Sequence, residues 1–212
     1  MIFALVRHGQ TVWNTQNRLQ GRGDSALTPL GEEQARRAGR ELVGIAAWEV
    51  LVCSPLPRTR STAALIGAEI GLDLAETVPD LIERSYGKAE GMTPGEAAVE
   101  WPEGVQMPID GTGRAHVADT GVPGAETREQ VAERGAHALA QLARQYPDRL
   151  VVAVAHGTII RETLNALLDV PVPRIGNGEV TLVDRDRHGH VSLIPPERYG
   201  DYPQLRAAAA QS

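Results

Sequence analysis

The sequence is poor in cysteine, and it has no long apolar run. Cys53 is the single cysteine of 212 residues and lies within an apolar stretch, which excludes a disulfide framework and a cysteine-based metal cluster. No stretch approaches the roughly 18 apolar residues of a membrane helix, and the first apolar run is too short and lacks the basic flank of a signal peptide. We therefore expect a soluble, cytoplasmic protein that does not bind membranes.

Positive charge is also scarce, and almost all of it is arginine. The 21 lysine and arginine residues face 27 acidic ones, for a net charge of -6. We expect no nucleic-acid partner, because such a surface needs a clustered basic face. Lys88 is the single lysine. The arginine guanidinium binds two phosphate oxygens at once better than a lysine ammonium does. A bias toward arginine across the whole chain is nevertheless explained more simply by genomic composition than by a binding site at each arginine.

The chain is long enough for one full hydrophobic core. With 42% hydrophobic residues over 212 positions, we expect a single domain over residues 1–194 that contains a lid insertion over about residues 84–126. Residues 195–212 read as a polar, alanine-rich C-terminal tail with nothing to bury, and we expect this tail to be partly loose. The sequence leaves the oligomeric state open between a monomer and a homodimer.

Three apolar runs end abruptly in basic or histidine side chains. They cover residues 1–6, 49–53 and 150–155, and each is followed at once by polar residues. Any one such joint is more simply an ordinary strand-to-helix turn, but three joints of the same charge favour a shared site. In an open parallel sheet, ligands bind beyond the carboxyl ends of the strands. The sequence therefore predicts an anion site made by Arg7, His8, Arg58 and His156.

Strand-like and helix-like segments alternate along the chain. Thr28-Pro29 predicts the start of a helix over residues 29–45, and a second helix, with Arg58 near its start, ends at Gly71. The other expected elements are a strand at 74–78, helices after Thr93, Thr127 and His156, and an edge hairpin of residues 179–184 and 190–194. This order predicts an α/β fold, a three-layer αβα sandwich with a mostly parallel central sheet and a lid over the strand carboxyl ends.

Two stretches lack any regular apolar period. Residues 12–27, which include Asn14, read as a loop that passes over the strand ends. Residues 102–125 hold five glycines and three prolines. A structureless stretch of that length in a compact domain is usually functional, so we expect it to belong to the lid.

The chemistry of two imidazoles beside two guanidiniums favours an anion over a metal ion. Metal shells are usually completed by carboxylate or thiolate, and arginines would repel the cation, so we expect no metal. Phosphoryl transfer needs positioning and charge stabilisation, and a neutral imidazole can attack phosphorus to form a phosphohistidine. The leaving alkoxide then needs a proton from a nearby carboxylic acid. The candidates for this acid are Asp80, Glu83, Glu90 and Glu126.

Five motifs stand in order along the chain. They are Arg7-His8-Gly9-Gln10-Thr11 with Trp13-Asn14, Ser54-Pro55-Leu56-Pro57-Arg58 with Thr62-Ala63, Leu81-Ile82-Glu83, Pro123-Gly124-Ala125-Glu126-Thr127, and Ala155-His156-Gly157. In this order they resemble the motifs of the histidine phosphatase superfamily, in the branch shared with cofactor-dependent phosphoglycerate mutase. The resemblance implies that His8 is the phosphorylated nucleophile and that Glu83 is the proton donor. It further implies a phosphate clamp of Arg7, Arg58 and His156, with Asn14 lining the pocket.

The resemblance leaves three functions to weigh. The loop from Glu83 to Gly87 looks like the mutase version, but residues 92–123 offer only Arg114 and His116 where mutases carry a pair of adjacent arginines. We therefore expect a phosphomonoester hydrolase that acts on a small phosphorylated metabolite without a cofactor. The alternative is a mutase, which would need 2,3-bisphosphoglycerate. An inactive phospholigand-binding module is less favoured, because the chain keeps the nucleophile, the clamp and the acid.

Overall fold

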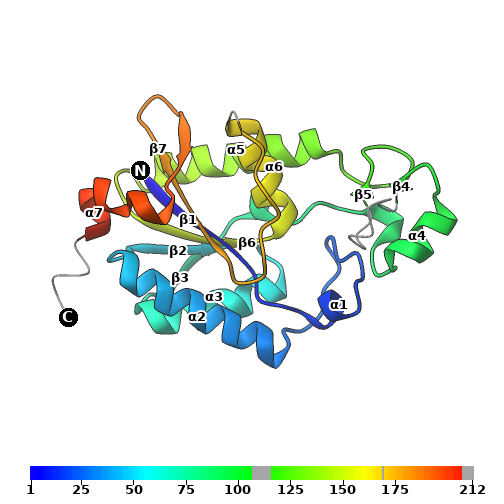
Figure 1. Ribbon diagram of the computed structural model, residues 1–212, viewed down its shortest axis with the longest axis horizontal. Coiled ribbons are helices and arrows are strands. Elements are labelled where there is room, and N and C mark those ends of the chain that lie inside the picture. The colour runs from blue at the N-terminus through cyan, green and yellow to red at the C-terminus, as the bar shows by residue number, and fades with distance from the viewer. Residues whose placement is uncertain (107–115, 169, 207–212) are drawn as a thin grey trace.

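A six-stranded sheet lies between two layers of helices, as Figure 1 shows. The computed structural model describes residues 1–106, 116–168 and 170–206. The strands are β1 Ile2–Arg7, β2 Val50–Cys53, β3 Leu74–Thr77, β6 Val151–Ala155, β7 Val180–Arg185 and β8 Val191–Leu193. Their order is β3-β2-β6-β1-β7-β8. The first four of this order pair in parallel, whereas β7 runs antiparallel to β1 and pairs with β8 as the expected edge hairpin.

The helices begin largely where the capping residues predict. The α-helices are α1 Val12–Thr15, α2 Pro29–Ile45, α3 Pro57–Ile70, α4 Pro94–Glu100, α5 Arg128–Gln145, α6 Gly157–Leu167 and α7 Pro203–Arg206. Short 3-10 turns occur at η1 Pro79–Leu81, η2 Gly87–Ala89 and η3 Pro196–Asp201. The side chains of Thr28, Thr93 and Thr127 cap α2, α4 and α5. None of the helices in the described part of the chain is long and apolar enough to cross a membrane.

Helix α1 departs from the expected loop over residues 12–27. The Thr11 side chain accepts a hydrogen bond from the Asn14 N–H, and the Asn14 side chain accepts one from the Thr11 N–H. This capping box closes a single helical turn. A helix of four residues is too short to show an apolar period, so the sequence pattern could not reveal it.

Strand β1 is buried on both faces, which explains why its sequence is an uninterrupted apolar run. Alternate residues point to opposite helix layers. Phe3 and Leu5 pack in the cluster that holds Leu139 of α5 and Leu164 of α6. Ile2, Ala4 and Val6 pack in the cluster that holds Leu42 of α2, Ile66 of α3 and Cys53 of β2. Cys53 is a free and buried thiol, as we expected, and burial raises its pKa to about 11.

The inserted segment forms a small unit of its own beyond the carboxyl end of β1 (Figure 1). It contains α4 and a two-stranded sheet of β4 Val105–Gln106 and β5 His116–Val117, in which Val105 pairs with Val117. Its apolar cluster consists of Ala89, Ala97, Val105, Val117 and Val122. The described residues are therefore more regular than the structureless lid that we predicted, because a few scattered apolar residues suffice for a small core. Arg114 lies outside the described residues.

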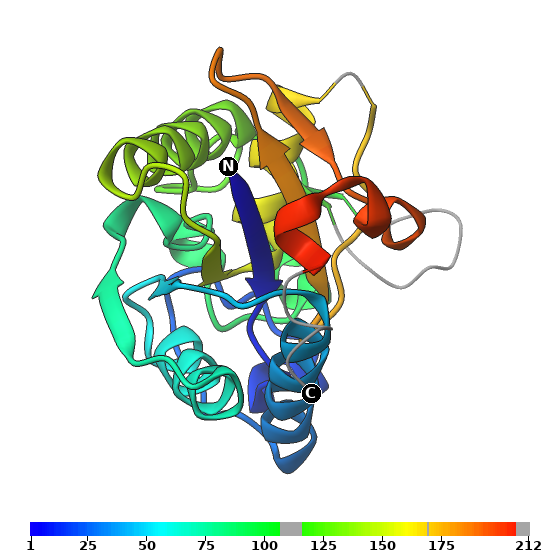
Figure 2. The same cartoon turned by 90° about the vertical axis from the view of Figure 1, so that its left-hand side faces the viewer.

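The described part of the C-terminal tail packs on the domain. Tyr199, Tyr202 and Leu205 recur every three residues and contact the cluster on the α2 side of the sheet. Only 5% of Leu205 is exposed. Figure 2 shows this segment beside the start of β1. Our expectation that the tail has nothing to bury is wrong for these residues. The three side chains lie on one side of two short turns, and the polar residues between them obscured this pattern in the sequence. Residues 207–212 lie outside the described range.

Candidate active site

The four residues that the strand ends predicted do meet at one corner of the sheet. Arg7 and His8 end β1, His156 ends the adjacent strand β6, and Arg58 lies in the first turn of α3 after β2. The His8 N–H donates to the carbonyl of Ala155 at 3.0 Å, which joins the first two strand ends. The rings of His8 and His156 lie edge to face with their centroids 5.2 Å apart. The two imidazoles therefore share one site.

The protonation state of His8 follows from its hydrogen bond. Its Nδ1 lies 2.7 Å from the carbonyl oxygen of Gly9, and a carbonyl oxygen can only accept, so Nδ1 carries the proton. Nε2 is then the nitrogen with a free lone pair. Burial lowers the pKa of His8 well below 6.5, and the positive charges of Arg7 and Arg58 lower it further. His8 is therefore a neutral imidazole with its basic nitrogen available.

His156 is completely buried and is held by a residue that sequence reasoning did not single out for this role. Its Nε2 lies 2.7 Å from Oγ of Ser54, at the end of the neighbouring strand β2. Its Nδ1 has no hydrogen-bond partner among the described residues. Burial lowers the pKa of His156 well below its usual value, followed by the charge of Arg58. This imidazole is also neutral.

Arg58 is buried and serves two roles. Its Nη1 and Nη2 donate to the carbonyl oxygens of Gly23 and Gly21, each at 2.7 Å, and Nη1 pairs with Asp24 at 3.3 Å. These bonds hold the loop after α1 against the strand ends. Its Nε has no partner among the described residues and can donate to an anion. Burial lowers the pKa of Arg58, but an arginine stays charged at any pH at which a protein is folded.

Two glycines allow the backbone to come together at this corner. A Cβ on Gly9 would lie 2.1 Å from the carbonyl oxygen of Gly31 in α2, so only glycine fits after His8. A Cβ on Gly157 would lie 3.2 Å from Nε of Arg7. Arg7 therefore packs closely against the first residue of α6, while its Nη1 donates to the carbonyl of Ile175 at 2.8 Å.

Of the four acids that the sequence offered as proton donors, only Glu83 lines the cavity at the strand ends. Its carboxylate lies at the amino end of α6. Oε1 accepts the N–H groups of Arg84 and Ile159, at 2.8 and 3.0 Å, and Oε2 accepts the N–H of Thr158 at 3.1 Å. Oε2 thus keeps the larger capacity for a further hydrogen bond or a proton, and it is the oxygen suited to proton transfer.

The three other acids hold parts of the fold together. Glu90 accepts the N–H groups of Arg22, Gly23 and Tyr86, each at 3.0 Å. Asp80 pairs with the exposed His137 at 2.7 Å. Glu126 binds Arg134, Arg22 and the N–H of Ser85. Burial alone would raise the pKa of Glu126, but the hydrogen bonds from Arg134 and Ser85 outweigh burial and hold the pKa below its ordinary value.

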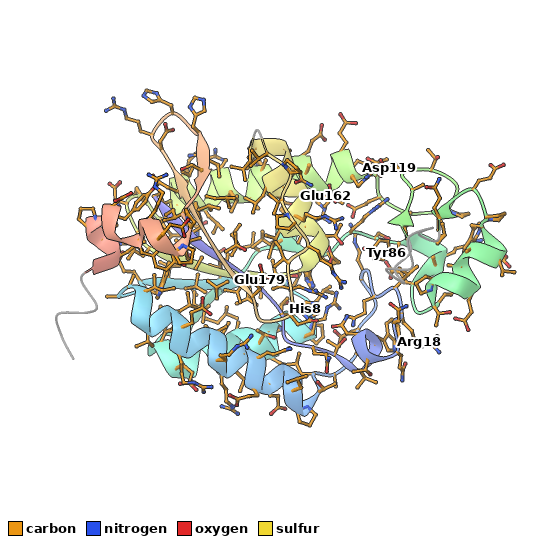
Figure 3. The ribbon with its side chains drawn as sticks, in the orientation of Figure 1. His8, Arg18, Tyr86, Asp119, Glu162 and Glu179 are labelled. Atoms are coloured by element: carbon orange, nitrogen blue, oxygen red, sulfur yellow. The ribbon has the colours of Figure 1, made fainter. Side chains whose placement is uncertain are left out.

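The corner opens into a cavity of about 330 Å³, a volume suited to a small molecule. Asn14 lines it, as the resemblance implied, and is fixed by Nδ2 of Asn177, which donates to Asn14 Oδ1 at 3.2 Å and to the His8 carbonyl at 3.0 Å. Figure 3 shows His8 at the end of β1, with Arg18 and Tyr86 toward the inserted segment. Six arginines line the cavity, namely Arg7, Arg18, Arg58, Arg84, Arg161 and Arg174.

No group of three or more histidine, cysteine, aspartate or glutamate side chains in the described ranges is arranged to hold a metal ion. The buried polar atoms that face the corner are instead donors, or can become donors, as Nε of Arg58 and Nδ1 of His156 illustrate. Such a donor set fits an oxyanion.

Comparison with known proteins gives the family. The profile of the histidine phosphatase superfamily (branch 1) matches residues 3–193. The chain belongs to this superfamily. The histidine phosphatase fold and the family membership that the motifs predicted are thus confirmed.

Named relatives of this histidine phosphatase include phosphatases. The uncharacterized phosphatase PhoE of Bacillus subtilis is 36% identical over 163 residues, which cover 77% of this chain and 75% of the relative. Relatives named as probable phosphoglycerate mutases match at 29% identity. With the phosphatase relatives, the prediction of a phosphomonoester hydrolase of this superfamily is confirmed.

Solved structures share the fold of this histidine phosphatase over almost its whole length. The mycobacterial glucosyl-3-phosphoglycerate phosphatase in complex with VO3 has a TM-score of 0.75 at 29% identity, covering 91% of this chain and 96% of that one. The phosphoserine phosphatase of Entamoeba histolytica in complex with 3-phosphoglyceric acid has a TM-score of 0.72 at 25% identity, covering 92% and 95%.

Several residues of the histidine phosphatase cavity were not singled out from the sequence as site residues. Arg161, Arg174 and Asn177 line the cavity, and Ser54 supports His156. Arg161 follows the second His-Gly pair by four residues, so helical spacing could have found it. Arg174 and Asn177 belong to the loop before β7, and no local pattern indicated that this loop reaches the site.

Proposed function

We propose that this enzyme hydrolyses small phosphomonoesters in two steps through a phosphohistidine on His8. The observation that carries the proposal is the hydrogen bond from His8 Nδ1 to the Gly9 carbonyl, which leaves the lone pair of Nε2 free to attack phosphorus. The lowered pKa of His8 keeps this imidazole neutral. In the first step the Nε2–P bond forms and the bond from phosphorus to the alcohol oxygen breaks.

The phosphoryl group is held by the clamp of Arg7, Arg58 and His156. Nε of Arg58 is an unpartnered donor, and the start of α6 contributes the positive end of its dipole. Nε2 of His156 lies 2.7 Å from Oγ of Ser54. In the proposed mechanism this hydroxyl donates its hydrogen to Nε2, which leaves the imidazole proton on Nδ1. His156 then donates from Nδ1 to a phosphoryl oxygen while it stays neutral. Asn14 lines the same pocket and positions the substrate.

Glu83 supplies the proton that the leaving alkoxide takes up. Its place in the cavity and the remaining capacity of Oε2 support this role. In the second step the same carboxylate accepts a proton from water, the oxygen of that water attacks phosphorus, and the Nε2–P bond breaks. Inorganic phosphate leaves and the starting state of His8 is restored.

The positions of the cations near the inserted segment favour hydrolysis over the mutase reaction, because a mutase must hold its product. Nε, Nη1 and Nη2 of Arg84 all donate to backbone carbonyls, and Lys88 is exposed and does not line the cavity. Neither residue is therefore placed to hold a product. The 3-phosphoglyceric acid in the Entamoeba structure supports a small phosphorylated metabolite as substrate. A cytoplasmic location, supported by the single reduced Cys53, belongs to the same proposal.

The proposal is tested by trapping the phosphoenzyme. Rapid acid-free quenching after mixing with a radiolabelled phosphomonoester should give alkali-stable label that maps to His8 by peptide mass spectrometry. His8→Ala should lose both the label and the turnover, while His188→Ala, in the exposed turn between β7 and β8, should retain both. Label on His156, or turnover by His8→Ala at a comparable rate, would contradict the proposal.

A further inference from the structure

The cavity carries more positive charge than one phosphoryl group requires. Its lining includes six arginines, whereas Glu83 is the single acidic side chain that lines it among the described residues. Arg7 and Arg58 serve the phosphoryl group. Charges of one sign gathered in a partly enclosed cavity repel one another, and an anionic ligand relieves this repulsion.

Two of the remaining arginines have other partners. Arg84 donates to the carbonyl oxygens of Glu126, Val117 and Ala118, at 2.8 to 2.9 Å, and only 3% of it is exposed. Arg18 donates to the carbonyl of Gly91 at 2.6 Å and lies 3.7 Å from a carboxylate oxygen of Glu96. These bonds tie the inserted segment to the domain, which leaves Arg161 and Arg174 to be explained.

Arg161 lines the cavity and pairs with a neighbour in its own helix. It follows Gly157 by four residues, so the two lie on one face of α6. Its Nε and Nη2 donate to the same oxygen of Glu162, at 3.0 and 2.6 Å, and Glu162 is 91% buried. Nη1 is not part of this pair and is available to a ligand. Figure 3 shows Glu162 on α6, in the helix layer that covers the sheet near His8.

Arg174 is exposed on a loop whose backbone is anchored at the catalytic corner. The neighbouring Val172 and Ile175 are buried, and the Ile175 carbonyl accepts Nη1 of Arg7 at 2.8 Å. Two residues further on, Asn177 donates to the His8 carbonyl. Arg174 itself forms no ion pair with a described residue. The anchored loop therefore places Arg174 at the cavity, where its side chain has no ion-pair partner among the described residues.

We propose that Arg161 and Arg174 form a second oxyanion subsite, which selects phosphomonoesters whose alcohol part carries a carboxylate or a second phosphate. This inference rests on the proposed function. The guanidinium fork matches both oxyanions, and the cavity is small enough to keep both groups of a small metabolite in contact with arginines. Arg161 and Arg174 are thus specificity-determining residues, because they contact the leaving part of the substrate and not the phosphoryl group.

Three substrates that share a three-carbon frame test the subsite. Glycerol 3-phosphate is the reference without a second anion, 3-phosphoglycerate adds a carboxylate, and glycerol 1,3-bisphosphate adds a phosphate. Steady-state phosphate release should give a kcat/KM at least about ten-fold higher for one of the two anionic substrates than for the reference. The substrate that shows the preference identifies which oxyanion the subsite takes.

Variants connect the preference to the two arginines. Arg161→Gln and Arg174→Gln should each lose at least about five times more kcat/KM on the preferred substrate than on glycerol 3-phosphate, and Arg174→Glu should reverse the preference. Arg144→Gln, on an exposed position of α5, is the matched control and should leave the ratio unchanged. Because Arg161→Gln leaves the buried Glu162 without its partner and can fail to fold, Arg174→Gln on the loop is sufficient by itself.

The failure of this inference differs from the failure of the proposed function. A phosphoenzyme on His8 with equal kcat/KM for all three substrates would overturn the subsite and leave hydrolysis through His8 intact. Equal losses on all substrates in Arg174→Gln would likewise overturn it, because the residue would then act on the phosphoryl group or on the fold. Absence of any phosphoenzyme with all three substrates would contradict the proposed function itself.

Discussion

Oγ of Ser54 lies 2.7 Å from Nε2 of His156, across two paired strand ends. Both side chains are completely buried, so the direction of this hydrogen bond and the nitrogen of His156 that carries the proton are coupled. A hydroxyl that donates to Nε2 places the proton on Nδ1, where the imidazole can donate to an oxyanion. A serine that looked like part of a turn is thus the hydrogen-bond partner that holds His156 at the corner.

The first prediction concerns this serine. Ser54→Ala should lower the rate of phosphoenzyme formation by about ten-fold to a hundred-fold, because it removes one hydrogen bond of about 1–3 kcal/mol that orients His156. Rapid-quench kinetics measure the rate directly. Ser61→Ala, at an exposed position of α3, is the control. A Ser54→Ala rate equal to that of the native enzyme, with unchanged thermal stability, would show that the hydroxyl does not set the tautomer.

The second prediction concerns the charge of His8. Burial lowers the pKa of His8 well below 6.5 in the folded protein. Just below pH 6.5, His8 is therefore protonated in the unfolded chain but neutral in the folded protein. Stability that is present above pH 6.5 should therefore fall as the pH drops below it, by up to about 1.4 kcal/mol per pH unit for this group. Urea unfolding at pH 5 to 8 measures the slope, and His8→Asn should reduce it but leave the contribution of His156, whose pKa is also lowered. An unchanged slope in His8→Asn would contradict the lowered pKa.

The third prediction concerns proton donation. Glu83→Gln should slow alkyl phosphates by about 10² to 10⁴, because a poor leaving group needs the proton. An aryl phosphate with an acidic leaving group should lose much less. Glu90→Gln is the matched control, since Glu90 binds loop N–H groups outside the cavity and should affect both substrates alike. Equal losses on both substrates in Glu83→Gln would show that Glu83 only supports the fold.

The fourth prediction concerns the network that joins the inserted segment to the domain. Glu126 pairs with Arg134 at 3.0 Å and with Arg22 at 2.9 Å. Glu126→Gln should lower stability at pH 7 by about 1–3 kcal/mol, because Arg134 would lose its charged partner. The depressed pKa of Glu126 means that this stabilisation is present above the unfolded pKa and is lost as the pH falls through the folded pKa.

Melting curves of both proteins test this sign. The difference in Tm between the native protein and Glu126→Gln should shrink as the pH is lowered from 7 toward 3.5. A difference that grows at low pH would contradict the depressed pKa. Retained kcat in Glu126→Gln at temperatures where it is folded would agree with the absence of Glu126 from the cavity lining.

The fifth prediction separates hydrolysis from the mutase reaction. Incubated with 3-phosphoglycerate and a bisphosphoglycerate primer, the enzyme should form little 2-phosphoglycerate, and phosphate release should not require the primer. A mutase must exclude water while it holds the phosphoenzyme and its product, and Arg84 is engaged with backbone carbonyls instead. Efficient interconversion with negligible phosphate release would overturn the assignment.

The corner itself was predictable because each of its residues follows an apolar run. Arg7, His8 and His156 stand at the ends of strands that are buried on both faces, and such runs are recognisable without any partner. Parallel strands bring their carboxyl ends to one edge, so the chemistry of single strand ends implied a shared site. Arg58 was predictable in the same way, from the strand before it.

The choice of acid needed more than local sequence. Chemical reasoning left four carboxylates as candidates for the proton donor, and the resemblance to the histidine phosphatase superfamily favoured Glu83. Only the tertiary structure shows why Glu83 differs from Glu90 and Glu126, since its carboxylate meets the start of α6, 75 residues away in sequence. The other two are occupied by loop N–H groups and arginines that come from distant segments.

Residue identities alone thus indicated that Arg7, His8, Arg58 and His156 meet at one corner, together with the strand-and-helix order, because these depend on short apolar periods and on what directly follows them. The packed structure alone decided that Arg174 and Asn177 belong to the site. Their loop reaches the catalytic edge because β7 runs antiparallel to β1, so that its amino end, and not its carboxyl end, lies beside His8. Strand direction depends on pairing between residues about 180 positions apart, and no local pattern encodes it.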